Sequence, residues 1–218
     1  MIETENLTVT LPSRAGDVNI LRGIDLSVAA GQTVGLIGPS GSGKTTLLMV
    51  LAGLEPPSGG FVAVAGCDYS AMSEDDLARF RRTHIGIVFQ SFHLVPTMTA
   101  LENTALPLEL AGEKNCRERA AAILDEVSLA DRYDHYPAQM SGGEQQRVAL
   151  ARAMVADPPV LFADEPTGNL DQATGDSIMQ LILSLAKNRQ STLFLITHDR
   201  ALAEKCDRTL TMRDGLLA

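Results

Sequence analysis

The chain has 218 residues, of which 45% are hydrophobic and 21% charged, and this suits one large α/β domain with a sizeable core. Its net charge of −9 disfavours nonspecific attraction to nucleic acid or to an anionic membrane surface. The longest apolar run, 47–54, is far shorter than the roughly 20 residues that span a bilayer. The segment 1–5 lacks the basic start and apolar middle of a signal peptide. We therefore expect a soluble, cytoplasmic protein.

Strand and helix patterns alternate along the chain, which predicts a parallel sheet flanked by helices. Strands are predicted at 5–9, 20–28, 32–37, 61–64, 85–89, 160–163 and 192–197. Turn residues such as Pro12-Ser13 separate the strands that we expect to form a small β-subdomain. Helices are predicted at 46–52, 120–127, 142–156 and 175–187, and one more begins at the capping box Thr99-Ala100-Leu101-Glu102. Pro107 is expected to kink or end that last helix.

A glycine-rich loop lies between the strand at 32–37 and the helix at 46–52, and its sequence is Gly38-Pro39-Ser40-Gly41-Ser42-Gly43-Lys44-Thr45. The glycines let backbone N–H groups face phosphate oxygens, and the helix start adds its positive dipole end. Lys44 would reach the β- and γ-phosphates, and Thr45 would offer its hydroxyl to Mg²⁺. The pattern therefore predicts a nucleoside triphosphate site that extends to Thr46.

Two carboxylates, Asp164 and Glu165, follow the apolar strand at 160–163 directly. Open α/β sheets place their ligands at such strand ends, so Asp164 could hold Mg²⁺ and Glu165 could polarise a water molecule. An acidic turn leading into Pro166 is the plain structural alternative. A P-loop kinase or a Ras-like GTPase is compatible with these two motifs, although the chain lacks the Asn-Lys-x-Asp motif that reads guanine.

The segment Ser141-Gly142-Gly143-Glu144 has the spacing of a capping box. Glycine in the first turn of a helix costs up to about 1 kcal/mol relative to alanine, so two in succession are unexpected in a simple cap. They are explained if a ligand approaches the backbone closely. The segment therefore predicts a second phosphate site at a helix start.

The whole chain resembles the ATP-binding subunit of an ABC transporter. Six motifs in the family order carry this resemblance, whereas a lone glutamine or histidine would be an ordinary strand-end residue. They are Gly38 to Thr45 as Walker A, Gln90 as the Q-loop, Ser141 to Glu144 as the signature, 160–165 as Walker B, Asn169-Leu170-Asp171 as the D-loop and His198 as the switch histidine.

The resemblance implies a P-loop (RecA-like) NTPase core, an antiparallel β-subdomain and an inserted α-helical signature subdomain. The residues 1–218 would form one ABC ATPase domain, with the core and β-subdomain at 1–92 and 157–218 and the helical subdomain at 93–156. ATP and Mg²⁺ are the implied cofactors, and the partners are a second copy and a membrane permease.

The resemblance also assigns roles to residues. Thr45, Gln90 and Asp164 would organise Mg²⁺. Glu165 would be the general base, with Lys44 and His198 as the other catalytic residues. Ser141, Gly142 and Gly143 would close over ATP held on the P-loop of another copy. Glu144 and Asp171 are also among the implied nucleotide-binding residues.

A closer resemblance is to the lipoprotein-releasing and macrolide-export branch, including YbbA-like proteins, and it rests on residues 89–103, 141–152 and 163–171. It implies a peripheral subunit at the cytoplasmic face of the inner membrane, where ATP drives a permease that exports or extracts lipophilic cargo. The alternatives are a regulatory ABC ATPase without cargo and a soluble ABC protein of translation or DNA repair. The last class has paired cassettes or coiled-coil insertions, which this chain lacks.

One residue departs from the family pattern. Many members carry an aromatic residue near the end of the first strand, where it stacks on adenine, and this chain has Leu11 there. Leucine offers an apolar contact without a π-face, so we expect loose selectivity for the base. The sequence sets no register for 12–19.

Overall fold

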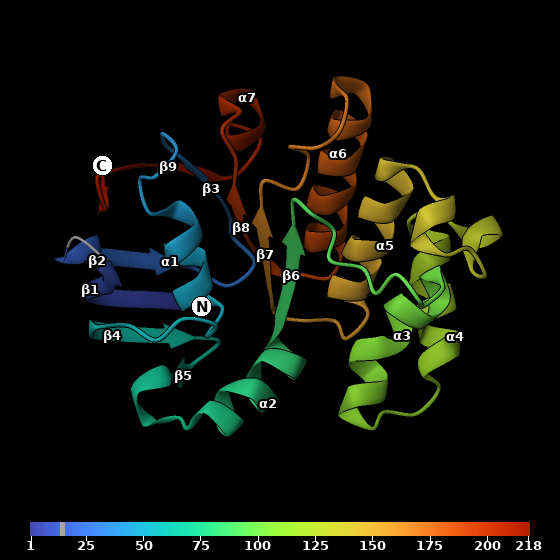
Figure 1. Cartoon of the computed structure of the whole chain (residues 1–218), viewed down its shortest axis with the longest axis horizontal. Helices are drawn as coiled ribbons and strands as arrows, with labels where there is room; N and C mark the ends of the chain where they lie inside the picture. The colour runs from blue at the N-terminus through green and yellow to red at the C-terminus, as the bar shows by residue number, and fades with distance from the viewer. Residues whose placement is uncertain (14–15) are drawn as a thin grey trace. The chain divides into compact units, whose positions relative to one another are not determined.

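The computed structural model describes residues 1–13 and 16–218, which divide into two compact units (Figure 1). The first unit comprises 1–81 and 192–218, and the second comprises 82–191. The boundary between them falls within helix α2 (Glu74–His84). The subdomain boundaries at 93 and 156 stay a prediction.

The first unit contains two groups of paired strands, three short helical elements and most of α2. The strands are β1 (Ile2–Ser13), β2 (Gly16–Val28), β3 (Thr33–Ile37), β4 (Gly59–Val64), β5 (Cys67–Asp68), β8 (Thr192–Ile196), β9 (Arg208–Arg213) and β10 (Leu216–Leu217). The helices besides α2 are α1 (Lys44–Leu51), the 3₁₀ turn η1 (Tyr69–Ala71) and α7 (Arg200–Ala203). Strand β1 pairs antiparallel with β2 and β4, and β5 pairs with β4. Strand β3 is parallel to both β8 and β9, and β10 pairs antiparallel with β9.

Strands β3 and β8 are short apolar runs, and this is typical of parallel strands covered on both faces. Every residue of β8 is buried, as are Val34 and Leu36 of β3. Helix α7 lies so close to β3 that a Cβ atom on Gly35 would come within 2.9 Å of Cα of Ala203. The loop that follows β3 therefore begins at a strand whose side chains are closely packed.

The second unit contains two parallel strands and a group of helices (Figure 1). Its elements are β6 (Ile85–Phe89), α3 (Ala100–Ala111), α4 (Cys116–Glu126), the 3₁₀ turns η2 (Ala130–Arg132) and η3 (Pro137–Gln139), α5 (Gly142–Met154), β7 (Val160–Asp164) and α6 (Gln172–Asn188). Helix α5 contacts α3, α4, α6 and β6. It is therefore the central helix of this unit, and its first residues are the signature glycines.

The helix after Thr99 begins as predicted but does not end at Pro107. The Thr99 hydroxyl accepts the N–H of Glu102 at 3.2 Å, and the Glu102 carboxylate accepts the N–H of Thr99 at 2.8 Å. The helix then continues through Pro107 to Ala111, so the expected end was wrong. Proline removes one backbone hydrogen bond, and buried residues on either side, including Asn103 and Leu108, hold the helix in place.

Strands β1 and β2 are longer than predicted, so Pro12-Ser13 belongs to a strand rather than to a turn. Pro12 lies opposite Asp17, and Leu11 lies opposite Val18. Among the described residues β1 pairs with β4 only as far as Thr8, so Pro12 lies on an edge where its missing N–H is tolerated. Residues 14 and 15 lie outside the described part of the chain.

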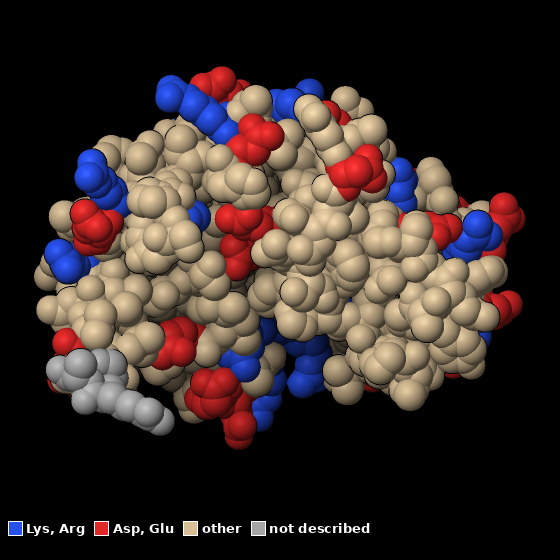
Figure 2. Space-filling view, turned by 45° about the horizontal axis from the view of Figure 1, so that its top comes forward, with Lys and Arg blue, Asp and Glu red and all other residues tan. Residues whose placement is uncertain are grey.

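The surface of the described residues carries both signs of charge. On the face shown in Figure 2, Lys and Arg side chains are interspersed with Asp and Glu. None of the described helices is both long enough and apolar enough to cross a membrane.

Candidate functional site

The glycine-rich loop of the first unit ends at a helix start that has no side-chain cap. Gly43 is the N-cap of α1 with φ 104°, and no acidic residue lies in the first turn. A helix start exposes N–H groups and the positive end of the dipole, which anions satisfy when side chains do not. A Cβ atom on Gly38 would lie 2.1 Å from the carbonyl oxygen of Met212, so only glycine fits there. The loop therefore has the backbone form of a phosphate site.

Two polar side chains of the loop, those of Ser42 and Lys44, are buried. Lys44 is 7% exposed, and its Nζ donates hydrogen bonds of 2.9 Å to the carbonyl oxygens of Gly38 and Pro39. The buried Ser42 hydroxyl has no hydrogen-bond partner among the described residues. A buried hydroxyl without a partner is costly, and the positive charge of Lys44 in the same loop attracts an anion. The arrangement therefore fits the phosphates of a nucleotide.

The first unit also holds the other residues of 1–81 and 192–218 that are predicted to contact the nucleotide. Thr45 and Thr46 lie in the first turn of α1, after the exposed Ser40 and Gly41 of the loop. His198 follows β8 and is exposed. Leu11 is 37% exposed on β1, opposite the exposed Val18.

In the second unit, three predicted residues come together where β6 and β7 end. Phe89 lies opposite Asp164 in the parallel pair, so Gln90 and Glu165 follow at adjacent positions. Glu165 has φ 46°, a left-handed conformation that is uncommon for a residue with a side chain. The structure therefore places a carboxylate pair and an amide at one edge of the sheet.

The Q-loop and the D-loop are joined directly. Gln90 Nε2 donates to Asn169 Oδ1 at 3.1 Å, and Asn169 Nδ2 donates back to the Gln90 carbonyl at 3.0 Å. A Cβ atom on Gly168 would lie 2.7 Å from Gln90 Nε2, so the glycine leaves room for this pair. Asp171 caps α6 by accepting the N–H of Thr174 at 3.1 Å, and Thr174 lowers the pKa of Asp171. Gln90 is thus hydrogen-bonded to the loop that contains the predicted residue Asp171.

Gln146 was not predicted, yet it connects the signature helix to both strand ends. It is fully buried, and its Nε2 donates to the carbonyl oxygens of Pro166 at 2.6 Å and Phe89 at 3.4 Å. Its Oε1 is buried, and none of the described residues is a hydrogen-bond partner for it. In the sequence, Gln146 could have been noticed as a polar residue four positions before Leu150, on the face of an amphipathic helix that is expected to be buried.

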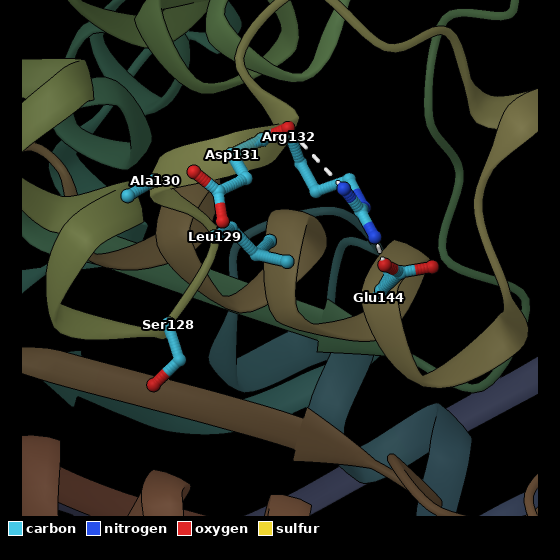
Figure 3. Close-up of a pocket in the computed structure, with 6 residues that line it drawn as sticks. All are labelled: Ser128, Leu129, Ala130, Asp131, Arg132 and Glu144. Atoms are coloured by element: carbon cyan, nitrogen blue, oxygen red, sulfur yellow. Dashed lines mark hydrogen bonds and ion pairs between the residues drawn. The ribbon is translucent and has the colours of Figure 1, made fainter.

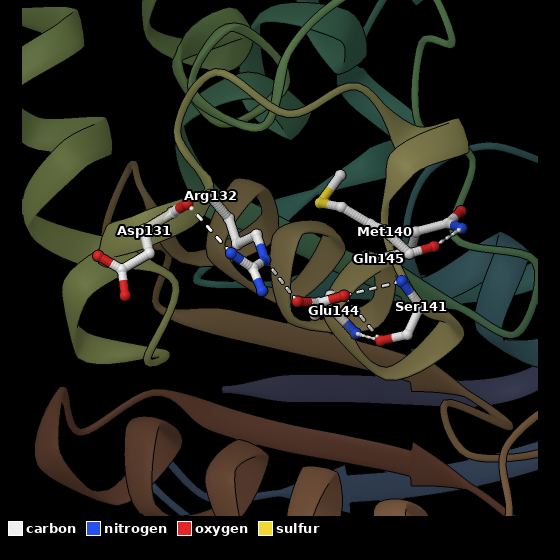
Figure 4. A network of polar contacts seen from close by, with 6 residues as sticks. All are labelled: Asp131, Arg132, Met140, Ser141, Glu144 and Gln145. Atoms are coloured by element: carbon white, nitrogen blue, oxygen red, sulfur yellow. Dashed lines mark hydrogen bonds and ion pairs between the residues drawn. The ribbon is translucent and has the colours of Figure 1, made fainter.

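The signature begins with the capping box that the sequence predicts (Figure 4). Glu144 Oε2 accepts the backbone N–H of Ser141 at 2.8 Å and its hydroxyl at 2.9 Å. The Ser141 oxygen accepts the N–H of Glu144 at 3.3 Å. Gly142 and Gly143 therefore start α5 with no side chain of their own.

Gly143 has a structural role that the sequence did not reveal. A Cβ atom there would lie 2.7 Å from Cγ2 of Thr174 on α6, closer than real contacts allow. The gain in helix propensity that alanine would bring at this position is therefore opposed by close packing between α5 and α6. The corresponding distance for Gly142 is 3.3 Å, to the flexible end of Leu170.

We expect Gly143→Ala to lower both ATPase activity and the free energy of unfolding. Adding Thr174→Ser removes Cγ2 and keeps the backbone N–H that Asp171 accepts, so thermal unfolding should return towards that of the parent. Activity should stay low if the new methyl group blocks a phosphate at the signature. A double variant that regains both stability and activity would show that Gly143 serves packing alone.

Comparisons with known proteins agree with the motifs. Residues 21–168 match the ABC transporter family. The chain is 49% identical to the YbbA ATP-binding protein of Escherichia coli K12, over 100% of this chain and 96% of that protein. It is 45% identical to the lipoprotein-releasing ATP-binding protein LolD of Legionella pneumophila strain Paris, over 92% of this chain and 89% of that protein. It is 46% identical to the macrolide export protein MacB of Rhodopirellula baltica, over 93% of this chain but only 30% of that protein.

The solved structures show the same fold. A dimeric structure of the bacterial ABC transporter cassette MJ0796 has a TM-score of 0.92 at 38% identity, covering 100% of this chain and 96% of that chain. A second structure of MJ0796, a dimer bound to ADP and phosphate after hydrolysis, has a TM-score of 0.91 at 37% identity, with the same coverage. The fold is thus the predicted P-loop core with an antiparallel β-subdomain and a helical signature subdomain.

Proposed function

Because the chain belongs to the ABC transporter family of ATP-binding subunits and is therefore an ATPase, we propose that two copies enclose two ATP molecules and that hydrolysis drives a membrane permease. The observation that carries this proposal is the uncapped start of α1, beside the buried Lys44 and the unpartnered Ser42 hydroxyl. The dimeric structures described for MJ0796 support it.

We assign the triphosphate to the loop before α1. Backbone N–H groups around Gly41 and Gly43 would take phosphate oxygens, and Ser42 would donate its unpartnered hydroxyl. Lys44 would exchange the carbonyl oxygens it now contacts for the β- and γ-phosphates. Leu11 would supply an apolar contact to the base.

Thr45, Gln90 and Asp164 are the proposed Mg²⁺ ligands. Their hydroxyl, amide and carboxylate oxygens are the donors that this hard cation prefers, so the set fits the ion chemically. When bound, the ion would neutralise part of the phosphate charge.

Glu165 is the proposed general base. Its carboxylate would orient a water molecule and accept its proton as the water oxygen bonds to the γ-phosphorus and the bond to ADP breaks. His198 would contact the γ-phosphate. Lys44 would stabilise the charge on the oxygens during transfer.

The signature would act on ATP held by the other copy. The backbone N–H groups of Gly142 and Gly143 lie at the start of a helix of 13 residues, where an anion is stabilised by the dipole. Ser141 adds a hydroxyl, and Asp171 lies in the loop joined to Gln90. ATP would therefore complete the interface between the two copies, and hydrolysis would release them.

The proposed partner is an integral membrane permease that moves lipophilic cargo. The relatives named as a lipoprotein-releasing ATPase and as a macrolide export ATP-binding and permease protein support this assignment. The chain would sit at the cytoplasmic face of the inner membrane and contact it only through the permease.

The cargo proposal can be separated from the regulatory alternative. We expect the complex of this chain with its permease, purified in detergent and placed in vesicles that contain labelled lipid and lipoprotein, to release label when ATP is added. Glu165→Gln should abolish release in the same complex. ATP hydrolysis without release of label would instead favour a regulatory ATPase.

A further inference from the structure

An arginine outside the signature holds the signature glutamate (Figure 4). Arg132 Nε donates to Glu144 Oε1 at 2.7 Å, while the other carboxylate oxygen, Oε2, accepts both groups of Ser141. The contact joins η2 to the first turn of α5, 12 positions apart in the sequence. Glu144 is thus linked to Arg132 on one side and to Ser141 on the other.

Arg132 reaches Glu144 from the rim of a surface hollow of about 270 Å³ (Figure 3). The hollow is lined by Ser128, Leu129, Ala130, Asp131, Arg132 and Glu144. The Arg132 side chain is 39% exposed and that of Glu144 is 26% exposed. An ion pair as exposed as this one contributes little to the free energy of unfolding. Stability alone therefore does not explain why Arg132 and Glu144 are paired.

The charge of Glu144 creates a difficulty for phosphate binding. The backbone N–H of Ser141, and then the Arg132 guanidinium, lower the pKa of Glu144 to about 2, so the carboxylate is ionised at neutral pH. Helix α1 carries no acidic residue in its first turn, whereas α5 carries Glu144 there. A fixed anion beside a helix start repels the phosphate that the helix start would bind.

We propose that Arg132 is a positioning residue that neutralises Glu144 and holds it against Ser141, so that the signature can accept the triphosphate of a second copy. The inference rests on the proposed function, because it concerns the same contact between the signature and ATP. Glu144 would orient Ser141 and the start of α5, and Arg132 would remove the electrostatic penalty of having a carboxylate in that position.

The chain contains a matched arrangement at another helix start. In α2, the hydroxyl of Ser73 donates to Asp76 Oδ2 at 2.6 Å, and Arg79 Nη1 donates to Asp76 Oδ1 at 2.9 Å. There the helix begins with Glu74-Asp75 in place of two glycines, so it is unsuited to an anion. Arg79→Met therefore removes the same charge from the same kind of cluster and serves as a control for Arg132→Met.

The test measures the ATP concentration needed for half-maximal dimerisation in the hydrolysis-blocked Glu165→Gln background, by light scattering with Mg²⁺ present. Arg132→Met should raise this concentration about three- to tenfold. A change of this size is expected when a charge interaction near the protein surface is lost at both signatures of the dimer. Arg79→Met should change it by less than about twofold. Arg132→Lys, which keeps the charge, should fall between Arg132→Met and the parent.

Removing the glutamate charge distinguishes neutralisation from a structural ion pair. Adding Glu144→Gln to Arg132→Met should recover most of the loss, because no carboxylate remains to repel phosphate. A structural pair would give a double variant no better than Arg132→Met alone. The defect of Arg132→Met should also shrink at high salt, where charge interactions are screened.

Each outcome bears on one of the two proposals. If Glu165→Gln dimerises with ATP but Arg132→Met behaves like Arg79→Met, or if Glu144→Gln gives no recovery, the role of Arg132 is refuted and the ATP dimer stands. If Glu165→Gln fails to dimerise at any ATP concentration, the dimer proposed for the isolated subunit is refuted and the role of Arg132 with it.

Discussion

Replacing Glu165 by glutamine should slow ATP turnover by about a hundredfold or more and leave ATP binding intact, since a positioned general base typically contributes at least this much. Glu165 directly follows the buried strand β7 and adopts a left-handed backbone conformation with φ 46°. Glutamine has the same shape, so it can keep the backbone conformation while losing the ability to accept a proton.

The experiment compares steady-state phosphate release and nucleotide binding for the purified variants. Glu118→Gln is a suitable control, because it removes one carboxylate from the exposed first turn of α4. It should hydrolyse ATP at the rate of the parent chain. Near-normal turnover by Glu165→Gln would remove Glu165 from the mechanism.

Dimerisation of the isolated chain should depend on ATP. The isolated chain should be monomeric without nucleotide, and Glu165→Gln should dimerise when ATP and Mg²⁺ are present. In the proposed dimer each site needs the P-loop of one copy and the signature of the other, so bound ATP would complete the interface. Blocking hydrolysis keeps the ligand in place.

The charge of the chain makes this dimerisation depend on salt. Two copies with a net charge of −9 repel each other, and ATP adds negative charge that Lys44 offsets only locally. The screening length is about 8 Å at physiological ionic strength and about 3 Å at 1 M, so added salt weakens the long-range repulsion. Direct contacts to phosphate weaken as well, and moderate salt should therefore favour the dimer over very low salt. Light scattering across a salt series measures this.

The strands and loops that form the site were predictable, because their signals are local. The fully buried β8 is a short apolar run, and the capping boxes at Thr99 and Ser141 have a fixed spacing between their residues. Helix α2 was not predicted. Its large apolar side chains are Leu77 and Phe80 alone, three positions apart, so its amphipathic pattern covers about one turn.

The contacts that support the site could not be predicted, because their partners are distant in the sequence. Gln90 and Asn169 are 79 positions apart, and Gln146 and Pro166 are 20 apart. The steric limit at Gly143 depends on α6 packing beside it, and no pattern around the glycine shows this. The motifs therefore predict which residues act, and tertiary packing determines which contacts hold those residues in place.

We propose that the signature of one copy binds ATP held by another. The molar mass of Glu165→Gln in ATP and Mg²⁺, measured with and without Ser141→Arg, tests this contact. Ser73→Arg is the control, because Ser73 also begins a helix and donates its hydroxyl to a carboxylate three residues later. We predict the mass of two copies for Glu165→Gln alone and with Ser73→Arg, and of one copy with Ser141→Arg. A single-copy mass for Glu165→Gln at every salt concentration, or a dimer that is indifferent to Ser141→Arg, would contradict the claim.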